Sequence, residues 1–162
     1  MTQSEFFPAS SVILLTLKGD LDVSKLHPPL PDLRLAPQEV LAQLQARDYD
    51  ALVDLSETGN IDGSYARISA LISAKESLFR TRRAPRRLAF WAPGDLAFGT
   101  CRMFEQMAQD RLSPDILVTR DQSEAIAHIG RREHSLERLK RALTDDHPPR
   151  GAGGPKQEAL AS

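Results

Sequence analysis

The sequence is poor in the residues on which several classes of protein depend. Its 162 residues include one cysteine, Cys101, which excludes a disulfide framework and a cysteine-based zinc site. The longest early apolar run, residues 12–15, is far too short to span a bilayer. The first residues also lack the basic start of a signal peptide. We therefore expect a cytoplasmic protein without a membrane span.

The chain also lacks a large net charge of either sign, which stands at −1. This total argues against nucleic acid as a partner, because a dedicated nucleic-acid-binding domain is clearly basic. The charge is nevertheless unevenly distributed. Residues 1–66 carry 10 acidic and 4 basic side chains, whereas residues 67–162 carry 12 acidic and 17 basic ones. This split predicts a charge polarity across the molecule, which favours a protein or an anion as partner.

Short apolar runs alternate with helical patterns along most of the chain. Strands are predicted at residues 12–17, 51–55, 88–92 and 116–119, with a short edge strand at Phe6 and Phe7. Helices are predicted at residues 37–47, 65–79, 95–107 and 121–129. The strands are continuous apolar runs, as burial on both faces of a parallel sheet requires. We therefore predict a single α/β domain whose mostly parallel sheet of four to five strands is covered by helices.

We place this α/β domain at residues 1–130. Residues 131–144 are predicted to form a charged helix, and residues 145–162 a disordered tail rich in proline and glycine. Four prolines predict a loop at residues 27–37. The charged helix has a narrow apolar stripe formed by Leu136, Leu139 and Leu143.

Local signals predict how the segments between the strands begin and end. Lys18, Gly19 and Asp20 predict a turn after the first long strand, and residues 57–63 predict a loop. Asp95 is expected to cap its helix, and Asp121 with Glu124 resembles a capping box. Gly99, within a predicted helix, would be explained by a close contact between helix and sheet. The predicted buried stripes comprise Tyr65, Ile68, Leu71, Ile72, Leu78 and Phe79 in one helix and Leu96, Thr100, Met103, Phe104 and Met107 in another.

Catalytic constellations are scarce, so we expect a protein that is not an enzyme and that uses no cofactor or metal. None of the four histidines has a serine or cysteine partner at a recognisable spacing. Cys101 lies in an apolar stripe, which predicts a buried, inert thiol. An enzyme that uses Asp54, Asp62 or Cys101 is the least favoured alternative.

Five arginines within eight residues form a candidate anion-binding patch: Arg80, Arg82, Arg83, Arg86 and Arg87. Guanidinium groups pair with phosphates and carboxylates. The structural alternative is that cations after a helix C-terminus stabilise its dipole. Separately from this patch, the loops around Gly59 and Gly94, which follow parallel strands, define an alternative function. In that alternative the domain binds a small molecule or anion, such as a nucleotide, phosphate or lipid.

Three stretches together resemble the STAS domains, the sulfate-transporter and anti-sigma-factor-antagonist family. Residues 16–22 are similar to the family's first strand and its G-[ED]-L-D turn. Residues 51–56 and 61–64 are similar to its central strand and D-S-S-G helix start, and residues 120–126 to its final strand-to-helix junction. The resemblance spans residues 12–130, and residues 91–104 look more like the divergent STAS-like proteins of bacteria.

The resemblance implies a non-enzymatic regulatory domain that binds a protein partner, in a pathway of the anti-sigma-factor-antagonist type. In the family's antagonists a kinase phosphorylates the first serine of the D-S-S-G stretch. Gly63 stands at that position and Ser64 matches the second serine, so either Ser64 substitutes or the chain is not phospho-regulated. The candidate partner-binding or switch residues are Gly19, Asp20, Asp62, Gly63 and Ser64. The structural alternative is that Asp62 or Ser64 simply caps the helix that follows.

Overall fold

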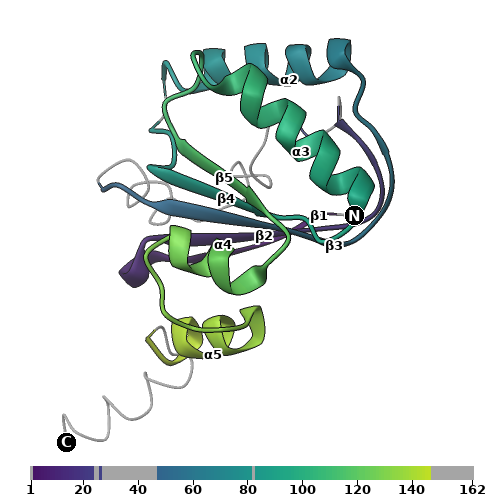
Figure 1. Cartoon of the computed structure of the whole chain (residues 1–162). Coiled ribbons are helices and arrows are strands. Elements are labelled where there is room, and N and C mark those ends of the chain that lie inside the picture. Colours follow the sequence, from purple (N-terminus) through teal and green to yellow (C-terminus); the bar gives the residue numbers. More distant parts are fainter. Residues whose placement is uncertain (1, 24–25, 27–46, 82, 147–162) are drawn as a thin grey trace, which may run out of the picture.

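Five strands form one sheet in the order in which they occur along the chain (Figure 1). The computed structural model describes residues 2–23, 26, 47–81 and 83–146. The strands are β1 (Thr2–Phe7), β2 (Val12–Asp22), β3 (Asp50–Asp62), β4 (Arg87–Trp91) and β5 (Asp115–Thr119). β1 runs antiparallel to β2, and every later neighbour is parallel. The predicted fold class is therefore confirmed.

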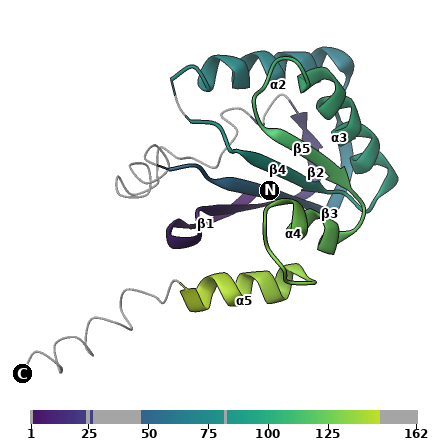
Figure 2. The same ribbon diagram turned by 60° about the vertical axis from the view of Figure 1, so that its left-hand side comes forward.

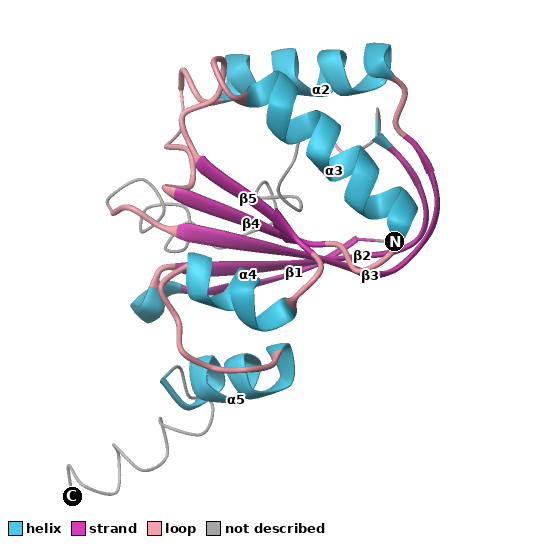
Figure 3. Cartoon of the chain, viewed as in Figure 1, coloured by secondary structure: helices cyan, strands magenta, loops and turns pink. Residues whose placement is uncertain are grey.

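Helices cover both faces of the sheet (Figure 3). One face carries α2 (Tyr65–Leu78) and α3 (Asp95–Ala108), and the other carries α4 (Gln122–His128) and α5 (Leu136–Asp146). A single 3-10 turn, η1 (Pro8–Ser10), connects β1 to β2. The predicted loop at residues 27–37 and the tail after residue 146 lie outside the described residues, as does nearly all of the helix predicted at residues 37–47.

The last helix belongs to the hydrophobic core, although the sequence suggested that the domain ends near residue 130. Leu136, Leu139 and Leu143 are buried in one cluster with Leu14 and Leu52 of the sheet. The helix also starts later and ends later than predicted, at Leu136 and Asp146. Figure 2 shows α5 lying beneath α4 and the first strands. Hydrophobic packing therefore continues well past residue 130, because the leucine stripe completes the core under the sheet.

The turn predicted at residues 18–20 and the loop predicted at residues 57–63 are wrong. β2 and β3 continue as a two-stranded ribbon beyond Asp54, the last residue of β3 that pairs with β4. The ribbon curves past α3 toward the start of α2 (Figure 1). Leu21 and Ile61 pack toward the helices, whereas their neighbours are more exposed. This alternation is the pattern expected of strands that have one face against the core. Gly19, with φ +76°, lies beside a register irregularity of the ribbon. Glycine adopts a positive φ easily, so the residue type that predicts a turn also suits an irregular position within a strand.

The stripe predicted for α3 is partly wrong, because three small residues are buried beside the correctly predicted Phe104. The buried positions are Ala97, Cys101, Phe104 and Ala108, which recur every three or four residues. Leu96 and Met103 instead face solvent, with 51% and 37% of their surface exposed. Small side chains let a helix approach a sheet closely, so the larger neighbours are rotated outward. In α2 the same correction applies to Tyr65, which is 69% exposed.

Two further expectations for α3 are also corrected. Gly94 is the N-cap, and Asp95 is the first helical residue without a side-chain capping bond. Gly99 faces open space, since a Cβ added there would meet no atom within 4 Å. A close contact therefore does not explain this glycine. The expected cap at Asp121 is confirmed, because its side chain accepts a hydrogen bond from the backbone N–H of Ser123.

Candidate functional site

The ribbon brings together the two stretches that carry the candidate switch residues. Gly19 lies opposite Thr58, and the Oδ1 atom of Asp20 accepts a hydrogen bond from the backbone N–H of Asn60 at 2.9 Å. A Cβ on Gly59 would stand 2.6 Å from the same Asp20 oxygen. A larger residue at position 59 would therefore displace the exposed Asp20 carboxylate, which lies close against the neighbouring strand.

An arginine in the first turn of α2 joins both strands of the ribbon. Arg67 donates from Nη1 to Oδ1 of Asp22 at 2.6 Å, and its Nε lies 3.2 Å from Oδ1 of Asp62. These two aspartates stand opposite each other in the ladder. One guanidinium therefore ties two carboxylates to the start of the helix.

Arg67 and Asp22 were not among the predicted site residues. A cation in the first turn of a helix opposes the helix dipole, so its presence there signals a carboxylate partner nearby. That signal could have singled out Arg67, but only the ribbon shows which acids it meets.

The start of α2 is held by its cap and by close packing. Ser64 is the N-cap, and its exposed Oγ accepts from the backbone N–H of Arg67 at 3.4 Å. A Cβ on Gly63 would lie 2.7 Å from Cγ2 of Thr100 and 3.2 Å from Cγ2 of Val23. Packing against α3 therefore requires glycine at position 63, whereas capping accounts for serine at position 64. The structural alternative is thus observed for Ser64.

Exposed apolar side chains lie beside this polar helix start. Leu96, Thr100 and Met103 share one side of α3 by their spacing, and Thr100 is the residue that meets Gly63. Tyr65 follows Ser64 directly. We call this region the helix-start surface and define it by its exposed residues Asp62, Ser64, Tyr65, Leu96 and Met103.

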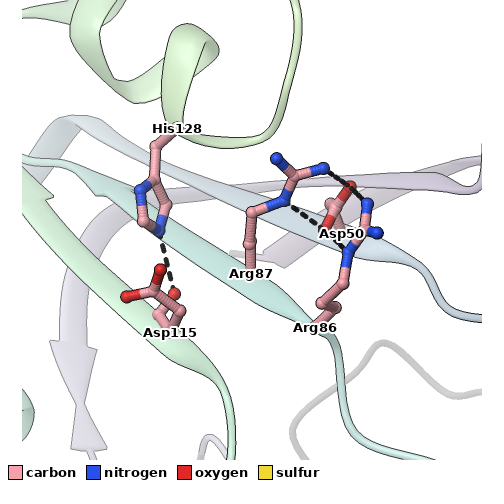
Figure 4. A network of polar contacts seen from close by, with 5 residues as sticks. All are labelled: Asp50, Arg86, Arg87, Asp115 and His128. Atoms are coloured by element: carbon pink, nitrogen blue, oxygen red, sulfur yellow. Dashed lines mark hydrogen bonds and ion pairs between the residues drawn. The ribbon is translucent and has the colours of Figure 1, made fainter.

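The arginine cluster binds carboxylates of the chain itself. Asp50, the first residue of β3, is 5% exposed and accepts hydrogen bonds from both Arg86 and Arg87 (Figure 4). Arg87 reaches it through Nε and Nη2, each at 3.1 Å, and the bond from Arg86 Nη2 is 3.2 Å. Arg83 donates to the carboxylate of Asp48 at 2.8 Å.

These pairs favour the structural interpretation of the arginines over an anion-binding one. They gather at the N-terminal ends of the parallel strands, away from the helix-start surface. Arg80 is exposed, and Arg82 lies outside the described residues.

The same network anchors the end of α4. Gly130 has φ +81°, and a Cβ there would stand 2.9 Å from Nη2 of Arg87. His128, the last residue of α4, holds its Nε2 atom 2.9 Å from the backbone carbonyl of Asp115 (Figure 4). Polar contacts therefore fasten this helix to the beginnings of the strands.

The residues considered for catalysis have local roles in the structure. Burial raises the pKa of the Cys101 thiol to about 12, so it carries its proton at neutral pH and is a poor nucleophile. Asp54 is half-buried, and its Oδ1 accepts from the backbone N–H of Ser56 at 2.8 Å. Within the described ranges, no three His, Cys, Asp or Glu side chains are arranged to hold a metal ion.

Comparisons with known proteins identify no relative. No family model matches the chain, and no curated protein or solved structure matches it significantly. Among the described helices, none combines the length and the apolar composition needed to cross a membrane. The resemblance to STAS domains therefore rests on the sequence motifs.

Proposed function

We propose that this chain is a non-enzymatic, cytoplasmic STAS-like regulatory domain that binds a protein partner through the helix-start surface. The observation that carries the proposal is the exposure of Tyr65, Leu96 and Met103 beside a polar helix start. Exposed apolar side chains that gather with polar residues around them are typical of surfaces that bind other proteins. A pathway of the anti-sigma-factor-antagonist type is part of the proposal.

The positions of two of the three motifs support it. Asp62, Gly63 and Ser64 lead from a central strand into a helix, and residues 120–126 connect β5 to α4. Both places agree with what the resemblance implies. The Gly19-Asp20 stretch lies in a strand instead of a turn, but it stands beside the end of β3 that leads into α2.

The helix-start surface is also suited to binding because its backbone is held in place. Arg67 bridges the two strands, and Gly63 packs against Thr100. A surface that is already ordered loses little conformational entropy when a partner binds. The partner would meet one fixed arrangement of the exposed side chains.

Pull-down from the cells that produce the protein, followed by mass spectrometry, tests this proposal. Met103→Glu and Ser64→Glu should each lose most of a specific protein partner, because each adds a charge to the docking surface. Arg138→Glu is the matched control, since it changes an exposed side chain of α5 on the opposite face of the sheet. Circular dichroism should show that all three variants keep the native helix content.

A partner retained equally by all three variants would contradict the surface assignment. If no protein is captured specifically by the wild-type chain, the proposed function itself fails.

A further inference from the structure

β1 lies at one end of the sheet, so one of its edges has no neighbouring strand among the described residues. Within the described part of the chain, β2 is its only sheet neighbour. The pairing of these strands has no register shift from Thr2 to Phe7.

The hydrogen bonds of β2 settle the direction of every backbone group in β1. The backbone N–H of Asp50 donates to the carbonyl of Ser11 at 2.9 Å, while Val12 stands opposite Asp50. In a parallel ladder this pattern turns the N–H and C=O of Val12 away from β3 and toward β1. Leu14 and Thr16 follow by alternation.

The partners of these β2 residues in β1 are Phe7, Glu5 and Gln3, so those three bond inward. The intervening residues Thr2, Ser4 and Phe6 must then direct their N–H and C=O groups outward.

This edge lacks the features that usually keep strand edges from pairing. It contains no proline, lysine or bulge. Its only charged residue, Glu5, lies on the α5 face, where the Lys140 ammonium is 3.5 Å from its carboxylate. A row of outward-directed backbone groups of this kind is a template for another strand.

The opposite edge of the sheet is shorter. The N–H of Asp115 donates to the carbonyl of Arg86, and the carbonyl of Thr119 accepts from Ala92. Both ends of β5 therefore bond inward, and by alternation only Ile116 and Val118 direct backbone groups outward. β1 is the better edge for pairing.

We propose that two copies of this chain pair through the outer edges of β1, antiparallel about a two-fold axis at Ser4. Ser4 then faces Ser4 of the second copy, and Thr2 faces Phe6. All three outward-pointing residues find partners, which gives about six backbone hydrogen bonds. The two sheets become one continuous sheet.

The side chains favour this register over the register shifted so that the two-fold axis passes through Glu5. With the axis at Ser4, Glu5 lies opposite Gln3 of the second copy, so a carboxylate meets an amide. With the axis at Glu5, two carboxylates would stand directly opposite each other, which destabilises strand pairing. The pairing does not depend on the proposed function. β2 separates β1 from β3, and α3 packs over β3 and β5.

Sedimentation equilibrium of the full chain tests the pairing over about a hundredfold range of protein concentration. The wild-type mass should rise with concentration from 17.9 kDa toward twice that value. Ser4→Pro should stay at the monomer mass, because it removes the central outward N–H without breaking a bond to β2. Edge strands tolerate proline at such positions, and circular dichroism checks that the monomer is folded.

Two substitutions of one residue test the register. Gln3→Glu places a second carboxylate opposite Glu5 and should raise the dimer dissociation constant about tenfold, since the contact occurs twice. Gln3→Lys, the matched control, should bind at least as tightly as the wild type. A monomeric wild-type chain overturns the proposal, as does a dimer that both Ser4→Pro and Gln3→Glu leave unchanged. If Ser4→Pro does not fold, the two Gln3 variants decide.

Discussion

Single residues show most clearly how this chain uses its charges. Asp50 begins a buried strand, where an unpaired carboxylate would be costly. Two guanidinium groups surround it, and the positions of those arginines after α2 follow from this need. A run of arginines that reads as an anion patch in the sequence is thus engaged largely within the chain.

Removing the Asp50 carboxylate should destabilise the protein strongly. We expect Asp50→Ala to lower the free energy of unfolding by about 2–4 kcal/mol, because two neighbouring cations lose a buried partner. The control Asp48→Ala breaks an exposed pair with Arg83 and should change it by no more than about 0.5 kcal/mol. Urea denaturation followed by circular dichroism measures both, and equal losses would refute the distinction.

Lys75 is a residue whose effect on stability should depend on pH. It lies half-buried one turn after Leu71 and Ile72 in α2, and burial of its ammonium lowers its pKa from 10.5 to about 7. Between these two values the unfolded chain holds a proton that the folded chain has released. The free energy of unfolding should therefore rise as the pH rises above about 7. Below that pH the folded chain bears the full free-energy cost of burying the charged ammonium.

The difference between wild type and Lys75→Met isolates this effect from other titrating groups. We expect the variant to be more stable at pH 6 than the wild type, and its advantage to shrink toward about pH 9. Thermal melts at several pH values measure the difference. A constant difference for Lys75→Met would refute the assignment.

At the scale of elements, helices α2 and α3 show that helical spacing of apolar residues does not determine which face of a helix is buried. The apolar positions of α3 do recur with helical spacing, but the face that meets the sheet is the one with alanine and cysteine. Leu96 and Met103 are displaced to the solvent side. That displacement creates the apolar part of the helix-start surface.

Gly99 offers a test within the same helix. A methyl group at this position meets no atom within 4 Å, so Gly99→Ala should stabilise the protein by about 0.5–1 kcal/mol through helix propensity alone. Gly63→Ala is the contrasting control and should destabilise it, because its Cβ would collide with Thr100. Differential scanning calorimetry compares the two. A lower melting temperature for Gly99→Ala would show that this position is constrained.

At the scale of the whole molecule, two opposite ends of one domain differ in the contacts that their residues make. Polar contacts at the starts of the strands fasten the fold, whereas the helix-start surface lies where β3 leads into α2. The core spans both faces of the sheet and includes α5.

Removing α5 tests whether it completes the core. A chain that ends at residue 130 loses the buried Leu136, Leu139 and Leu143, which exposes Leu14 and Leu52. We expect the truncated chain to lose cooperative unfolding and to bind a hydrophobic dye such as ANS, because partly packed states expose apolar surface. A chain that ends at residue 146 should behave like the full protein. A folded, cooperative chain of 130 residues would restore the boundary that the sequence suggested.

The sequence by itself determined the fold class, the central parts of the strands and the cap at Asp121. Each of these depends on neighbours along the chain: continuous apolar runs, helical spacing and one capping side chain. The tertiary structure alone decided that β2 and β3 continue as a ribbon, which face of α3 is buried and which acids the arginines meet.

It alone also placed Arg67 between Asp22 and Asp62, and Thr100 against Gly63. The physical reason is that periodicity shows which residues share a face, but not which partner that face meets. A strand edge, a buried face or an ion pair is defined only when distant segments come together.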